Sequence, residues 1–118
     1  MKLNLIVIRT ANMLQLVNFY KLLDLEFDYH KHEQGVYHYS AKIGETVFEI
    51  YPLLKSQTEA DISTRFGFKI DNFEEKLALL SDFMVSKPTQ TEFGLCAILK
   101  DTDGRKVEIF QNSLEKRQ

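Results

Sequence analysis

One short sequence occurs twice in this chain, half the chain's length apart, and each copy carries a glutamate among apolar residues. Val47–Tyr51 reads VFEIY and Lys106–Phe110 reads KVEIF, so Glu49 and Glu108 correspond. An ionised carboxylate inside an apolar strand is costly unless a partner pairs it or a function uses it. The repeat therefore predicts two modules built on one plan, with Glu49 and Glu108 as the first candidates for a functional site.

Composition excludes several classes of partner. The chain has 118 residues, of which 44% are hydrophobic and 27% charged, which is the usage of an ordinary folded domain. A net charge of −2 without a basic stripe argues against nucleic acid as a partner. No apolar run reaches the roughly 18 residues that a membrane span requires. We expect neither nucleic-acid nor membrane partners.

The single cysteine and the N-terminal segment indicate a cytoplasmic protein. Cys96 has no second cysteine with which to form an internal disulfide, as is usual in a reducing compartment. The apolar opening is interrupted by Asn4 and ends at Arg9 without a small-residue cleavage site, so it does not read as a signal peptide.

Hydrophobic periodicity predicts the order βαβββ in each half. Asn12 with Gln15, and Asn72 with Glu75, have the spacing of helix N-terminal capping boxes. The expected strands are 3–8, 25–32, 36–42, 45–51, 65–70, 84–87, 93–100 and 106–111, and the expected helices begin at the two asparagines. The expected organisation is one domain of two modules, 1–52 and 63–112, with a connection over 53–62 and a charged tail over 113–118.

Alternation along the strands predicts a polar face opposite the helices, because every second side chain points the same way. Phe66, Phe68 and Ile70 should pack on the helix, which leaves Arg65 on the face shared with Glu108. Leu3, Leu5 and Val7 take the corresponding positions with Glu49 in the first half. This mixed face suits a small-molecule cavity. It is equally compatible with the ordinary solvent-exposed side of an antiparallel sheet.

These features resemble the vicinal oxygen chelate superfamily, which includes glyoxalase I, extradiol dioxygenases and bleomycin and fosfomycin resistance proteins. Residues 12–25, NMLQLVNFYKLLDL, look like its helix ending in FYxxLGL, and 101–108, DTDGRKVE, look like its DPDGxxxE segment. Asp24 replaces the glycine and Thr102 the proline of these patterns. The resemblance covers residues 3–111. It implies an α+β fold of two tandem βαβββ modules forming a curved, mostly antiparallel sheet around a cavity.

The resemblance also implies a metal held by the first and last strands of each module, at the positions of Leu5, Glu49, Arg65 and Glu108. Leucine offers no donor atom, and arginine is a permanent cation without a lone pair for a metal. We therefore expect no metal cofactor. A divalent ion stays possible, with Glu49 and Glu108 as its ligands. The alternative is that Arg65 pairs with one or both carboxylates.

The three histidines allow two interpretations. His30 and His32 share a face of an expected strand and His38 follows on the next strand, so three imidazoles could meet and bind zinc. The interpretation that we favour from the sequence is a plain polar strand face, because these are not the superfamily's ligand positions. Ligand-contacting residues in the cavity are then predicted to be Leu5, His38, Tyr39, Glu49, Tyr51, Arg65 and Glu108.

Two functional hypotheses follow. In the first, which we place ahead, the chain is a bleomycin-resistance-like protein that binds a small molecule without the superfamily's metal. In the second, it is a glyoxalase-like lyase or isomerase, or a dioxygenase, with Glu49 or Glu108 as general base. A degenerate member that binds another protein is a third possibility. The resemblance further implies a homodimer.

Overall fold

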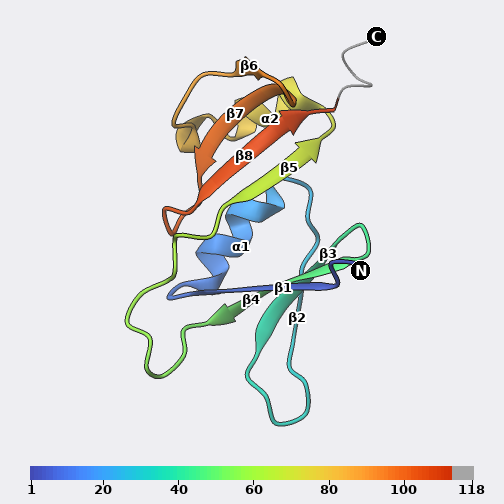
Figure 1. Ribbon diagram of the computed structural model, residues 1–118. Helices are drawn as coiled ribbons and strands as arrows, with labels where there is room; N and C mark the ends of the chain where they lie inside the picture. Colours follow the sequence, from blue (N-terminus) through green and yellow to red (C-terminus); the bar gives the residue numbers. More distant parts are fainter. Residues whose placement is uncertain (113–118) are drawn as a thin grey trace. The chain divides into compact units, whose positions relative to one another are not determined.

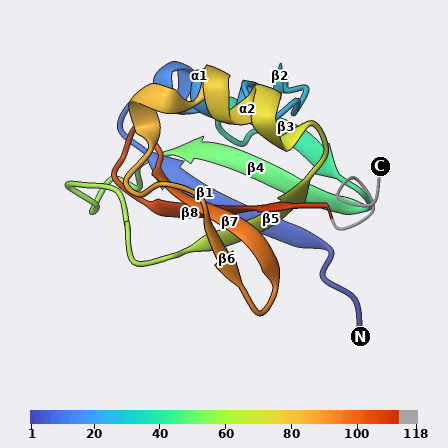
Figure 2. The same cartoon turned by 90° about the horizontal axis from the view of Figure 1, so that it is seen from above.

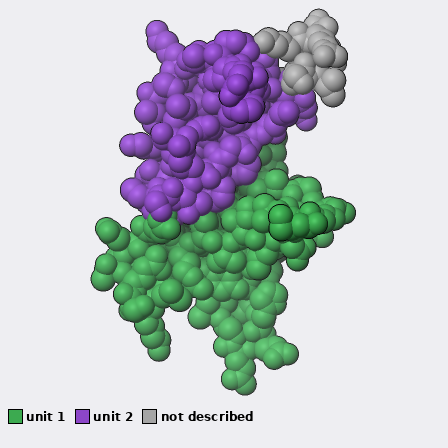
Figure 3. Space-filling model, viewed as in Figure 1, with its two compact units in different colours: residues 1–61 green, residues 62–118 purple. Residues whose placement is uncertain are grey.

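Each half of the chain builds one four-stranded mixed sheet and one α-helix (Figure 1). The computed structural model describes residues 1–112, so the expected tail at 113–118 lies outside the described residues. The chain divides into two units, Met1–Asp61 (unit 1) and Ile62–Gln118 (unit 2), shown in different colours in Figure 3.

Unit 1 has the order βαβββ that the sequence predicts. Its sheet runs in the order β1-β4-β3-β2, with β1 and β4 parallel and the other pairs antiparallel. Its elements are β1 (Leu5–Thr10), α1 (Met13–Lys21), β2 (Asp28–His30), β3 (His38–Ile43) and β4 (Thr46–Pro52).

Unit 2 repeats this plan. Its sheet runs in the order β5-β8-β7-β6, with β5 and β8 parallel and the other pairs antiparallel. Its elements are β5 (Phe66–Ile70), α2 (Phe73–Leu79), a 3-10 helix (Ser81–Phe83), β6 (Thr89–Thr91), β7 (Gly94–Lys100) and β8 (Lys106–Gln111). The predicted fold of two βαβββ modules is confirmed.

In both units, one face of the sheet packs against apolar side chains, while the glutamates lie on the other. Figure 2 shows each helix on one side of its own sheet. In unit 1, Phe48 and Ile50 are fully buried, and the ring of Phe48 contacts Tyr20 of α1 edge to face at 5.2 Å between centroids. In unit 2, Val107 and Ile109 of β8 are fully buried. Glu49 and Glu108 alternate with these pairs and so face away from them.

The predicted helix start at Asn12 is confirmed. Asn12 has an extended backbone, and its side-chain Oδ1 accepts a hydrogen bond from the backbone N–H of Gln15 at 3.1 Å. This bond satisfies one of the amide groups that have no partner within the first turn of a helix. Asn12 therefore fixes where α1 begins.

Asn12→Ala is expected to lower the free energy of unfolding by about 1 kcal/mol, because it removes this cap. Asn18→Ala is the matched control, since Asn18 is an exposed residue inside the same helix. Alanine has the higher helix propensity, so Asn18→Ala should stabilise the protein by up to about 0.7 kcal/mol. Urea denaturation followed by circular dichroism measures both changes. Equal effects of the two substitutions would contradict the capping role of Asn12.

Three expectations about local structure are wrong. Asn72 has a left-handed backbone (φ 55°) and makes no side-chain cap bond, so it does not cap α2 as Asn12 caps α1. Residues 84–87 contain only an isolated bridge from Met84 to Leu99, and the strand β6 lies beyond Pro88. The expected strand over 25–32 is only β2, because the chain leaves the sheet after His30. Whether such short segments form strands depends on pairing with neighbouring strands and not on the local sequence pattern.

Asp24 ends the segment after α1 in a left-handed conformation, with φ 67°. This region of φ favours glycine, which is the residue of the superfamily's pattern at this position.

No helix among residues 1–112 is both long enough and apolar enough to cross a membrane.

Candidate functional site

Glu49 lies at the centre of the polar face of unit 1. In the sheet it is opposite Val7 on the parallel strand β1 and Ser40 on the antiparallel strand β3. Only 7% of Glu49 is exposed. A carboxylate buried to this degree needs hydrogen-bond or ionic partners.

His38, the first residue of β3, provides the closest of these partners. It is fully buried, and its Nε2 lies 3.1 Å from Oε2 of Glu49. Its other ring nitrogen, Nδ1, lies 3.1 Å from the backbone carbonyl oxygen of Val36. Both nitrogens of the imidazole are therefore occupied, and the ring is held in one orientation.

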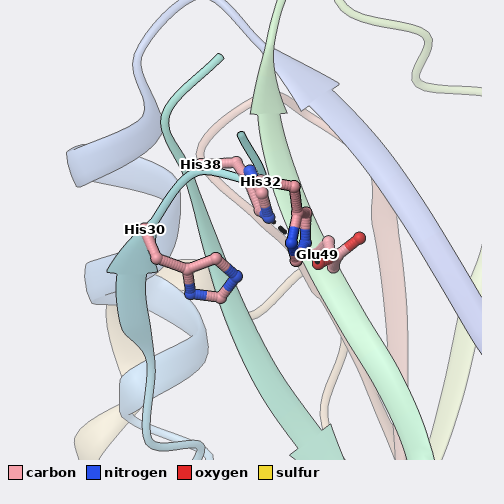
Figure 4. Close-up of side chains that lie close together, drawn as sticks. All are labelled: His30, His32, His38 and Glu49. Carbon is pink, nitrogen blue, oxygen red and sulfur yellow. Dashed lines mark hydrogen bonds and ion pairs between the residues drawn. The ribbon is translucent and has the colours of Figure 1, made fainter. Parts of the chain in front are cut away.

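The two other histidines of the chain lie beside this pair (Figure 4). His30 of β2 is opposite His38 in the sheet, and their ring centroids are 4.6 Å apart. His32 follows in the loop after β2, and its Nε2 lies 4.0 Å from Oε2 of Glu49. One potential ligand atom from each of the four residues lies within 4.8 Å of all the others. We call His30, His32, His38 and Glu49 the histidine cluster, and it could hold a metal ion.

From the sequence, a plain polar strand face was favoured for these histidines over a zinc site; His38 lies on that face beside Glu49 and is fully buried. That interpretation depended on where the superfamily places its ligands, whereas the cluster arises from pairing between neighbouring strands. His32 approaches Glu49 from a loop and not from a strand, and alternation along a strand could not predict this. The spacing of His30 and His32 was the available signal.

Tyr51 extends the same face. Its ring stacks on His38 with centroids 4.1 Å apart and an interplanar angle of 8°. The guanidinium carbon of Arg9 lies over the Tyr51 ring, 4.9 Å from its centroid, and Nη1 of Arg9 donates a hydrogen bond to the carbonyl of Pro52. Burial raises the pKa of Tyr51, the Glu49 carboxylate raises it further and Arg9 opposes the rise. Arg9 was not among the predicted site residues, although it is two positions after Val7 on β1 and so shares its face.

Glu108 has a different partner in unit 2. Arg65, which directly precedes β5, forms an ion pair with it through Nη2 and Oε1. The Arg65 side chain is 59% exposed and that of Glu108 is 22% exposed, so water reaches the pair. The pairing of an arginine with one of the two glutamates follows the expectation from the sequence, whereas Glu49 has histidine partners in its own unit. The role of either glutamate in binding or catalysis stays a prediction.

The residues at the superfamily's metal positions do not fit a metal. Leu5 has no donor atom and is 50% exposed on β1. Arg65 is a cation, and it is already paired with Glu108, one of the two remaining carboxylates. A cation beside the carboxylate opposes binding of a second cation there. We therefore assign no reaction step to a metal at these positions.

Tyr39 is not brought together with Glu49. In the sheet it is opposite Ile50, so its side chain lies on the face of Ile50 and Phe48. The Tyr39 ring packs against the rings of Phe27 and Tyr29, whose centroids lie 6.5 Å and 4.6 Å from its own. Of the predicted ligand-contacting residues in unit 1, Leu5, His38, Glu49 and Tyr51 share one face and Tyr39 lies on the other.

Two further features carry no chemistry that we can identify. Burial raises the pKa of the Cys96 thiol, and the Glu108 carboxylate adds to the rise, so the thiol form is favoured over the reactive thiolate. A hollow of about 440 Å³ in unit 1 is lined by residues including Asp24, Asp28 and Lys42. It contains none of the predicted site residues.

Comparison with known proteins identifies the fold. No protein-family model matches this chain, and no curated protein matches it. Among solved structures, the chain is similar to an integron cassette protein from the mobile metagenome of V. cholerae, with 18% identity over 94% of each chain and a TM-score of 0.70. It is also similar to TnmS3, an antibiotic binding protein from Streptomyces sp. CB03234, with 19% identity over 94% of this chain and 95% of that one and a TM-score of 0.69.

A third similar structure is lactoylglutathione lyase from Agrobacterium tumefaciens, with 11% identity over 96% of this chain and 95% of that one and a TM-score of 0.62. The chain therefore has a glyoxalase-like fold. At these identities the similarity defines the fold alone, because one fold hosts many activities.

Proposed function

We propose that this chain binds a small organic molecule on the polar faces of its modules, without the metal of the vicinal oxygen chelate superfamily. The observation that carries the proposal is the ion pair between Arg65 and Glu108, at two of the four family ligand positions. A guanidinium has five N–H donors, so Arg65 can bind Glu108 and an acceptor of a ligand together. TnmS3, described as an antibiotic binding protein, is a structural neighbour with this kind of function.

Binding accounts for this face better than proton abstraction does. A general base needs a carboxylate that can take up a proton from its substrate. The cation at Arg65 stabilises the ionised form of Glu108 and makes it a weaker base. Glu108 is opposite Ile98 in the sheet and shares a face with Phe110, so this polar pair beside apolar side chains is suited to orient a ligand that has both polar and apolar groups.

We also propose that the protein works as a homodimer. Leu3, Leu5 and Val7 are exposed apolar residues at or near β1, an edge strand of the unit 1 sheet. Exposed edge strands are usually covered in native proteins. Sedimentation equilibrium of the untagged protein tests this part of the proposal, and a monomer at micromolar concentration would contradict it.

Glu108→Gln is expected to weaken ligand binding about 10- to 100-fold, the effect of losing a hydrogen bond to a charged group. Bleomycin and a set of planar aromatic compounds that carry hydrogen-bond acceptors are suitable probes, with binding measured by equilibrium dialysis. Glu45→Gln is the control, because Glu45 pairs with Lys2 in an exposed ion pair outside the site. Affinity that is unchanged in Glu108→Gln, or no binding of any probe to the unmodified chain, would contradict the proposal.

A further inference from the structure

We infer that His30, His32, His38 and Glu49 form a binding site for a divalent transition metal ion, with zinc as the preferred ion. This metal site does not depend on the proposed small-molecule binding, because it needs neither Arg65 nor Glu108, whose ion pair carries that proposal. It also differs from the superfamily's metal site, whose positions in β1 and before β5 are Leu5 and Arg65. Only Glu49 would belong to both ligand sets.

The contacts of the two ring nitrogens of His38 indicate that a proton or a metal ion lies between His38 and Glu49. A backbone carbonyl only accepts hydrogen bonds, so Nδ1 of His38, 3.1 Å from the Val36 oxygen, carries a proton. In a neutral imidazole Nε2 then holds a lone pair, and it lies 3.1 Å from a carboxylate oxygen of Glu49. Two lone pairs facing each other at this distance repel. The arrangement therefore requires a proton or a metal ion shared by the two atoms.

The surroundings of His38 are those of a metal-binding histidine. A histidine that binds a metal usually donates its other N–H to a backbone carbonyl or a carboxylate, which fixes the tautomer and the ring orientation. His38 has this partner in Val36. It is also fully buried and stacked on Tyr51 at 4.1 Å, so the ring is held in place before any ion binds. Such a ligand loses little freedom when it coordinates.

The convergence of four ligand atoms, and not of two, points to a metal ion as the shared group. Two ligand atoms, each about 2.1 Å from a tetrahedral zinc ion, lie about 3.4 Å from each other. Nε2 of His38 and Oε2 of Glu49 are 3.1 Å apart, and Nε2 of His32 is 4.0 Å from the same oxygen. All four ligand atoms lie within 4.8 Å of one another. Turning the two less buried rings, those of His30 and His32, would close the remaining distances, whereas a shared proton explains only the contact of His38 with Glu49.

The donor set selects the ion and its role. Three imidazole nitrogens and one carboxylate oxygen suit zinc, while calcium and magnesium prefer oxygen ligands alone. Four protein ligands fill a tetrahedral shell, which is the pattern of a structural zinc site. The ion would attach the loop at His32 to β2, β3 and β4. We therefore expect it to raise the thermal unfolding midpoint and not to activate water.

The test uses the untagged full chain in metal-free buffer. Zinc chloride is titrated calorimetrically, and cobalt(II) chloride is titrated by visible absorption, whose bands report tetrahedral coordination. The expected result is one ion per chain, tetrahedral cobalt bands without thiolate charge transfer, and a higher unfolding midpoint with zinc. The chain has three histidines, all of them in the histidine cluster, so no other imidazole contributes.

Variants distinguish the possible sites. His32→Gln changes a side chain that is 69% exposed, so the variant should fold, which circular dichroism verifies. It and Glu49→Gln should each weaken zinc binding by at least about 10- to 100-fold, the loss that follows when a partner of a metal ligand is removed. Glu108→Gln should bind zinc as the unmodified chain does. Equal losses in Glu49→Gln and Glu108→Gln would overturn the inference in favour of the superfamily's site. It would also be overturned by an absence of stoichiometric binding, or by unchanged affinity in His32→Gln.

Discussion

Asp101→Ala is expected to lower the free energy of unfolding by about 3–5 kcal/mol, the usual cost of removing one partner of a buried ion pair. Asp101 is 4% exposed and Arg105 is fully buried. Oδ2 of Asp101 accepts a hydrogen bond of 2.7 Å from Nη1 of Arg105. A second carboxylate, that of Asp103, lies 3.4 Å from the same nitrogen, but Asp101 is the closer of these two partners.

The same carboxylate also fixes the turn between β7 and β8. Its Oδ1 accepts hydrogen bonds from the backbone N–H groups of Asp103, at 2.9 Å, and of Arg105, at 3.0 Å. Gly104, with φ 94°, allows the chain to turn here, and its N–H donates to the carbonyl of Asp101. Asp101→Ala therefore removes both the counter-charge and two acceptors of the turn.

Urea denaturation followed by circular dichroism measures the effect. Asp101→Asn keeps a carbonyl oxygen for the turn while it removes the charge, so its loss should be smaller than that of Asp101→Ala. Glu45→Ala is the control on the surface, where an exposed ion pair with Lys2 should contribute at most about 1 kcal/mol. A loss below about 1 kcal/mol in Asp101→Ala would show that the buried guanidinium does not need this partner.

Leu16→Ala should lower the free energy of unfolding by about 2–5 kcal/mol, whereas Leu14→Ala should change it by no more than about 0.5 kcal/mol. Both residues lie in α1. Leu16 is fully buried and Leu14 is 57% exposed. Removal of the Leu16 side chain leaves a cavity between α1 and its sheet, and close-packed neighbours fill it only in part.

The matched pair separates burial from helix propensity, because the substitution and the helix are the same. Thermal and urea unfolding of the two variants, compared with the unmodified chain, give the two free-energy changes. Similar effects at Leu14 and Leu16 would mean that the buried face of α1 does not stabilise unit 1. A larger effect at Leu14 would mean that the helix packs through the face that carries Leu14 and not through the face that carries Leu16.

Most of the fold could be predicted from the sequence, because the patterns that encode it are local and occur twice. Alternation predicts that Glu49 and Glu108 lie on a face away from the helices, and the residues on either side of each glutamate, Phe48 and Ile50, and Val107 and Ile109, are fully buried. The asparagine cap at Asn12 has a short-range signal and is confirmed. Each of these features depends on residues close together in the chain.

Segments with weak patterns were predicted less well. The two asparagines have the same spacing to a capping-box partner, yet only Asn12 caps its helix. The strand placed at 84–87 is a single bridge at Met84. A short strand forms where a neighbour offers its backbone groups in register, and such a neighbour can be distant in the sequence.

The candidate site shows the same limit. The sequence identified Glu49, Glu108 and Arg65 as charged residues on a face away from the helices, and it noted that three histidines could meet. It could not assign a partner to each carboxylate. Arg65 lies beside Glu108, and His38 lies beside Glu49, because strand pairing and the loop after β2 put them there.

The sequence by itself determined the two βαβββ modules, the apolar and polar faces of their sheets and the pair of carboxylates at corresponding positions. Periods of two and 3.6 residues along the chain are sufficient for these features. Only the tertiary structure decided that Glu49 is buried with histidines and Glu108 is paired with arginine. These contacts depend on strand register and on the path of a loop, which join residues far apart in the chain.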